Sequence, residues 1–155
     1  MALLDLFRGR SAKRNFSPAE EERVVAAIRE AEARTSGEIR VYIEHRCRYV
    51  DPLDRAMEVF LQLKMEQTRE RNGVLLYLAM KDRQLAVFGD EGIHQKVGSE
   101  FWNQEVAKIL SAFREDKKVE GLVDIVRDLG EALVTHFPYH DQDRNELSDT
   151  LVFGA

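Results

Sequence analysis

The chain has 155 residues, 44% of them hydrophobic and 33% charged, a balance typical of one globular domain with a heavily charged surface and not of a disordered chain. Its formal net charge of −5 at pH 7 argues against nucleic-acid binding, because such proteins usually carry a basic excess. No stretch approaches the ~20 apolar residues of a membrane span and no secretory signal is evident, so we expect a cytoplasmic protein without an integral membrane segment.

The first residues differ in charge from the rest of the chain. Arg8, Arg10, Lys13 and Arg14 make this end basic, and we expect residues 1–16 to form a mobile tail ahead of a single α/β domain over residues 17–155. A short amphipathic anchor at residues 2–8 is the alternative, but one apolar turn would give it little binding energy.

A helix is predicted to begin at Ser17-Pro18-Ala19-Glu20. Serine is a good N-cap, proline suits the first helical position, and glutamate at the third position completes a capping box. The helix should end at Thr35-Ser36-Gly37. The residues from Glu38 to His45 then alternate between apolar and polar side chains, which predicts a half-buried strand.

Asp51-Pro52 repeats the start pattern and predicts a second helix that ends at Asn72-Gly73. Apolar residues spaced mostly by three and four are expected to form its buried face, and they are Leu53, Met57, Phe60, Leu61 and Met65. Residues 74–80 are apolar on both alternating faces, which predicts a central strand covered on both sides. Residues 85–88 should return as its antiparallel partner.

Two further helices are predicted, one around residues 101–113 and one around residues 122–133. The whole order makes the first two strands parallel, because a helix connects them. We therefore expect an α/β fold, a three-layer α/β/α sandwich around a small mixed β-sheet. The final apolar residues, 151–153, are expected either to pack back on the domain or to contact another chain.

This topology brings acidic residues together at one edge of the sheet. Glu38 opens the first strand, while Asp90 and Glu91 follow the third, reversed strand, and Arg71 precedes the second. Carboxylate oxygens are the ligands that Ca²⁺ and Mg²⁺ take. The sequence therefore predicts a divalent-cation site at Glu38, Asp90 and Glu91. The alternative is a solvated acidic turn at Gly89–Gly92 that holds no ligand.

The opposite edge of the sheet holds His45 and Cys47. They could act as base and nucleophile, but residues two apart on a strand need not touch and no third orienting group is evident. A small cysteine that faces the core is the favoured interpretation. Because Cys47 is the only cysteine, an intrachain disulfide and a cysteine-rich zinc site are excluded. No P-loop pattern occurs, and no organic cofactor is expected.

Four blocks stand in an order and spacing that resemble the TPM domain family: Ser36–Val41, Arg71–Tyr77, Lys81–Arg83 and Gly89–Ile93. Phe101-Trp102 and the tail from His136 to Leu147 are similar to those of its small soluble bacterial members. The resemblance runs from about Ser17 to the C-terminus and implies an α/β/α fold. Through other members of the family, the resemblance also implies several functions. These are photosystem repair and weak acid phosphatase activity from plant members, receptor modulation from an animal member, and divalent-cation binding.

One block departs from the family form, in which the glycine turn reads more like Gly-Tyr-Gly-Leu-Glu. Here Asp90 and Glu91 occupy that turn and Ile93 falls near the family's glutamate. The phosphatase residues of the family are therefore not carried over to this chain.

Two functions are considered from the sequence. The favoured one is a non-catalytic accessory or interaction protein with an unidentified protein partner, and a bound divalent cation is an added prediction. The alternative is a slow metal-dependent acid phosphatase in which Glu38, Asp90 and Glu91 hold the cation. Such an enzyme should also offer a polar group to the leaving oxygen, and Arg71 is the only nearby candidate.

Overall fold

The computed structural model describes residues 16–139 and 151–154. The predicted N-terminal tail lies outside these residues apart from Phe16, whose side chain is buried in the core. Across the two described segments, no helix combines the length and the apolar character that crossing a bilayer would require.

The elements follow the predicted order, with a short helix, α4, and a fourth strand, β4, added. The chain runs through α2 (Pro18–Glu32), β1 (Glu38–Glu44), α3 (Pro52–Gln62), β2 (Gly73–Ala79), β3 (Gln84–Gly89), α4 (Glu91–Val97), α5 (Ser99–Arg114), α6 (Lys118–His136) and β4 (Leu151–Phe153). The capping box of α2 is confirmed. The Glu20 amide donates to Ser17 Oγ over 3.1 Å, and the Ser17 amide donates to Glu20 Oε1 over 2.8 Å.

The strand order of the sheet, within the described residues, is β3-β2-β1-β4. β1 and β2 are parallel with Glu38 opposite Gly73, and β3 runs antiparallel to β2 with Gly89 opposite Val74. β4 pairs in parallel with β1, so the final apolar segment packs back on the domain. β3 is therefore an outer strand, with β2 on one side only.

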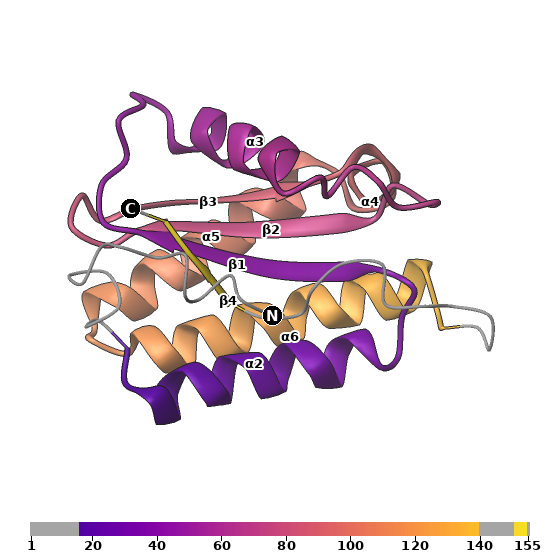
Figure 1. The fold of residues 1–155 in the computed structure, drawn as a ribbon. Helices are drawn as coiled ribbons and strands as arrows, with labels where there is room; N and C mark the ends of the chain where they lie inside the picture. The colour runs from indigo at the N-terminus through magenta and orange to yellow at the C-terminus, as the bar shows by residue number, and fades with distance from the viewer. Residues whose placement is uncertain (1–15, 140–150, 155) are drawn as a thin grey trace.

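Helices cover both faces of this sheet. Figure 1 shows α3 on one face and α2, α5 and α6 on the other. The predicted three-layer α/β/α sandwich with a small mixed sheet is thereby confirmed.

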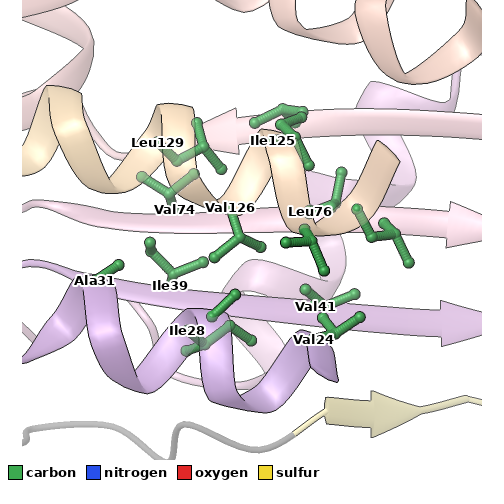
Figure 2. Packing of buried hydrophobic residues seen from close by; sticks show 14 of the residues in the cluster. Val24, Ile28, Ala31, Ile39, Val41, Val74, Leu76, Ile125, Val126 and Leu129 are labelled. Carbon is green, nitrogen blue, oxygen red and sulfur yellow. The ribbon is translucent and has the colours of Figure 1, made fainter. Parts of the chain in front are cut away.

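The larger hydrophobic cluster lies between the sheet and the helices α2 and α6. Figure 2 shows side chains from all of these elements meeting there, among them Val24, Ile28, Ala31, Ile39, Val41, Val74, Leu76, Ile125, Val126 and Leu129. Full burial of one valine, leucine or isoleucine side chain stabilises the fold by about 1.5–3 kcal/mol. This packing fixes the positions of β1 and β2. It therefore also fixes the residues at the two ends of these strands.

β1 is buried on both faces, so the prediction of a half-buried strand is wrong. Glu38, Arg40 and Glu44 are the polar half of its alternation, yet each is 5% exposed or less. They share a face of the strand with Tyr42, which packs on the cluster under α3. Polar side chains on that face are therefore covered by the α3 layer.

The prediction for the second helix is wrong in its end and in part of its buried face. The helix ends at Gln62, well before Asn72. Leu53, Met57 and Leu61, here called the α3 stripe, are 40%, 42% and 59% exposed. The side chains of α3 that are buried are Ala56, Val59 and Phe60. The apolar residues of α3 span more of the helix than one packed side can cover, and the sheet covers the side that carries Ala56, Val59 and Phe60.

Candidate functional site

The amino-terminal edge of β1 and β2 gathers the acidic residues singled out in the sequence. The Asp90 amide donates to the Gly73 carbonyl over 2.9 Å, and Glu38 is the partner of the same glycine on the other side of β2. Glu91 follows Asp90 as the first residue of α4. Glu38, Asp90 and Glu91 therefore share one edge of the sheet.

Asp90 and Arg71 form a bidentate ion pair. Arg71 Nε lies 2.7 Å from Asp90 Oδ2, and Arg71 Nη2 lies 2.9 Å from Asp90 Oδ1. Asp90 Oδ1 also accepts from the Glu91 amide over 2.8 Å, as the N-cap of α4. Asp90 is 3% exposed, so both of its oxygens are used inside the protein. The hydrogen bond to Asp90 raises the pKa of the Arg71 guanidinium.

This arrangement does not fit a divalent cation as it stands. A cation at Asp90 would have to displace the guanidinium of Arg71, which also lies 3.4 Å from Glu91 Oε1. In the described part of the chain, no group of three or more His, Cys, Asp or Glu side chains is placed to hold a metal ion. The cation site at Glu38, Asp90 and Glu91 stays a prediction.

The backbone of Arg71 is strained and is held by the start of α4. Its φ of 52° lies in the left-handed region, which is unfavourable for a residue with a side chain. Its carbonyl oxygen accepts from the amides of Gly92, over 2.8 Å, and Ile93, over 3.3 Å. These hydrogen bonds connect the loop before β2 to the start of α4. They thereby orient the Arg71 side chain toward Asp90.

Gly92→Ala is expected to lower the free energy of unfolding by about 2 kcal/mol, as overpacking usually does. A Cβ at this position would lie 2.6 Å from the Arg71 carbonyl oxygen and closer still to that of Glu70, and both are backbone atoms that cannot rotate away. Urea unfolding followed by tryptophan fluorescence measures the loss. Gln95→Ala, on the exposed part of α4, is the control and should change stability by less than about 0.5 kcal/mol. A loss at Gly92 as small as the control's would contradict the close packing.

A groove of about 710 Å³ runs along the outer edge of β3. Its floor is β3 itself, from Leu85 to Gly89. One wall begins with Leu53 at the start of α3, and the other carries Trp102 and Val106 of α5. Trp102 is fixed in this wall, because its Nε1 donates to His94 Nδ1 over 2.9 Å. The Arg71–Asp90 pair closes one end, so the groove and the acidic edge are continuous.

The carboxyl end of β1 carries a second buried ion pair, which the sequence did not indicate. Glu44 accepts from Arg55 Nε over 2.9 Å and from Arg55 Nη2 over 3.0 Å, and it also accepts from the Tyr77 hydroxyl. Burial, with the hydrogen bond to Glu44 as the next cause, raises the pKa of Tyr77. This carboxylate is fully engaged by α3 and β2, so it serves the packing of the α3 layer.

His45 and Cys47 lie beside this pair and do not hydrogen bond to each other. Cys47 is half-buried against the cluster under α3, and its Sγ lies 3.6 Å from the Tyr49 carbonyl oxygen. Its amide donates to Asp82 Oδ2 over 2.7 Å, which ties the loop to the β2–β3 turn. His45 Nδ1 is buried without a hydrogen-bond partner among the described residues. The arrangement matches the packing role favoured from the sequence.

The structure is a small α/β/α domain in which Arg71 pairs with Asp90 at one edge of the sheet and an open groove lies beside that pair. The family model of the TPM domain matches residues 12–132, and the chain belongs to this family. The resemblance drawn from the sequence is therefore confirmed. None of the curated proteins matches the chain.

The solved structures that are similar to this chain include two from bacteria. The BA42 protein from the psychrophilic bacterium Bizionia argentinensis, solved by NMR, is 41% identical, with 90% of this chain and 95% of that chain covered and a TM-score of 0.82. The N-terminal domain of the cg2496 protein from Corynebacterium glutamicum is 14% identical, with 84% of each chain covered and a TM-score of 0.61. The second likeness shows the fold alone.

Proposed function

We propose that this TPM domain is a non-catalytic accessory protein of the cytoplasm that acts by binding a protein partner. The observation that carries the proposal is the Arg71–Asp90 pair. A carboxylate whose two oxygens are held by a guanidinium and an amide is not available to activate water or to polarise a phosphoryl group. The groove beside this pair offers a surface for binding instead.

A slow metal-dependent acid phosphatase is the second candidate. Two observations favour it: the name of the matching family model refers to a phosphatase, and Glu38, Asp90 and Glu91 share one edge of the sheet. It requires Arg71 to release Asp90 before a Ca²⁺ or Mg²⁺ ion could bind.

A turnover measurement separates the two candidates. We expect purified wild-type protein to hydrolyse p-nitrophenyl phosphate no faster than the Asp90→Asn variant, with or without millimolar Mg²⁺ or Ca²⁺. Asparagine keeps the size of the side chain and removes its charge, so the comparison isolates the carboxylate. Cation-dependent turnover that is present in the wild type and lost in Asp90→Asn would overturn the non-catalytic proposal.

The cation itself is tested by competition with Arg71. A ligand that binds only the folded protein raises the midpoint of thermal unfolding. If Glu38, Asp90 and Glu91 bind Ca²⁺ or Mg²⁺, millimolar cation should raise the midpoint more in Arg71→Gln than in the wild type, because the competing guanidinium is gone. Asp90→Asn should abolish the rise. An unchanged midpoint in both the wild type and Arg71→Gln would remove the cation from the proposal.

A further inference from the structure

We propose that the outer edge of β3 binds an extended, apolar peptide segment with basic flanks, which joins the sheet as an added strand. This inference rests on the proposed function, that the chain acts by binding a protein, and it names the chemistry of the partner. Three features of the groove carry it: the direction of the backbone groups of β3, the two apolar walls, and the charges at the two ends.

The backbone of β3 presents unpaired groups to the groove. The ladder hydrogen bond from the Asp90 amide to the Gly73 carbonyl makes these two residues a hydrogen-bonded pair. Such pairs alternate along an antiparallel ladder, so Phe88 and Ala86 also bond to β2. Leu85, Val87 and Gly89 therefore direct their N–H and C=O groups away from β2, toward the groove that they floor. The backbone N–H and C=O groups of an extended peptide can form hydrogen bonds with this row of donors and acceptors.

The walls of the groove select apolar side chains. Trp102 and Val106 form one wall and Leu53 opens the other. Side chains of an added strand point alternately to its two faces, so successive residues of the peptide would meet α5 and α3 in turn. The guanidinium of Arg55, on one flank of α3, lies over the ring of Tyr42 in β1. Leu53, on the other flank of α3, lines the groove. The other two residues of the α3 stripe lie outside the lining of the groove, so Leu53 is the residue of the stripe that contributes to this wall.

The charges along the groove favour basic flanks on the peptide. The carboxylates that line it are Asp51, Asp90 and Glu91, against the single guanidinium of Arg71, which is already paired with Asp90. Asp51 precedes α3, which starts where β1 ends, while Glu91 follows β3 at the opposite edge. An exposed acid therefore lies at each end of the groove, Asp51 as the N-cap of α3 and Glu91 as the first residue of α4.

A single strand suits this groove better than a second copy of the chain. The β3 strand of a second copy would carry its own α3 and α5 on its two faces, and these would have to share space with the walls already present. A free peptide brings only its backbone and side chains. The partner inferred is therefore an extended segment of another protein.

The test uses the full-length ¹⁵N-labelled protein and the probe acetyl-Lys-Thr-Val-Val-Val-Thr-Lys-amide, which places valine on both faces of the added strand. Amide hydrogen exchange is measured by NMR with and without the probe, and emission from Trp102, the only tryptophan, gives the affinity. We expect exchange at Leu85, Val87 and Gly89 to slow on binding. Exchange at Ala86 and Phe88, which already bond to β2, should stay unchanged.

Matched peptides and variants isolate each feature. A probe with proline in place of the central valine should not bind, because it cannot complete the backbone ladder. A probe with glutamate in place of both lysines should bind about fivefold more weakly at low salt. Leu53→Lys, in the wall, should weaken binding of the lysine probe about tenfold. Leu61→Lys, on the same helix but outside the groove lining, should not weaken it.

Several results would overturn the inference. They are no slowing at Leu85, Val87 and Gly89 at saturating probe, equal binding of the proline probe, or protection of these amides that rises with protein concentration without any probe, which would indicate a second copy. These results concern peptide binding, whereas the proposed non-catalytic function is tested by phosphatase turnover. Failure of the peptide inference is therefore distinguishable from failure of the proposed non-catalytic function.

Discussion

Glu44→Ala is expected to lower the free energy of unfolding by about 3–5 kcal/mol, which is the usual result of removing one partner of a buried ion pair. The Glu44 and Arg55 side chains are 6% and 16% exposed, so the variant leaves a guanidinium with little access to water. It also leaves the hydroxyl of Tyr77, which is fully buried, without its carboxylate partner. Urea unfolding of the two proteins at neutral pH measures the difference.

The origin of this loss can be tested with two further variants. Glu58 also pairs with Arg55, but its side chain is 38% exposed, so Glu58→Ala should cost much less stability than Glu44→Ala. Replacing both Glu44 and Arg55 by leucine removes the charges together and should recover a large part of the stability lost in Glu44→Ala. If the double variant is as unstable as the single one, the loss comes from packing and not from an uncompensated buried charge.

The sequence predicted the sheet and its acidic edge because both depend on local patterns. The alternation from Glu38 to His45 and the apolar run over 74–80 place the strands, and one reversed strand is enough to bring Asp90 to the edge where Glu38 begins. What the pattern could not show is that Arg71 and Asp90 form an ion pair. The two residues are opposite in charge at one edge, which is the available hint, but the pairing also needs the left-handed backbone of Arg71.

The groove was missed for a different physical reason. Helical spacing identifies the apolar residues of α3 without showing which of them the sheet will cover. Among the residues that the structure describes, α3 is the helix that lies on that face of the sheet (Figure 1), and its stripe stays exposed beside the outer strand β3. Trp102 of α5 is 8% exposed, yet one part of it lines the groove.

The second large effect is expected between pH 4.5 and 8 and comes from Glu105 in α5. Its side chain is 4% exposed, and its Oε1 is buried without a hydrogen-bond partner among the described residues. Burial, followed by the neighbouring carboxylate of Asp128 in α6, raises the pKa of Glu105 from 4.5 to about 7. Lys108 lies 3.0 Å from Glu105 and 3.1 Å from Asp128, and it opposes the shift in part.

A raised carboxyl pKa means that the folded protein binds this proton more tightly than the unfolded chain does. The contribution of Glu105 to stability is therefore greatest below about pH 4.5 and declines as the pH rises toward about 7. One pKa unit corresponds to about 1.4 kcal/mol, so ionised Glu105 destabilises the fold by up to about 3 kcal/mol at pH 8. Glu105→Gln, which cannot ionise, should be more stable than the wild type by up to that amount at pH 8 and nearly equal to it at pH 4.5.

Urea unfolding at the two pH values, followed by the fluorescence of Trp102, measures this difference directly. Glu100→Gln is the matched control, because Glu100 is exposed on the same helix, and it should change stability by less than about 0.5 kcal/mol at either pH. The pH dependence is what identifies the cause. A Glu105→Gln variant that gains the same stability at both pH values would point to better packing, whereas a gain confined to high pH requires that a buried, ionised carboxylate opposes the contact between α5 and α6.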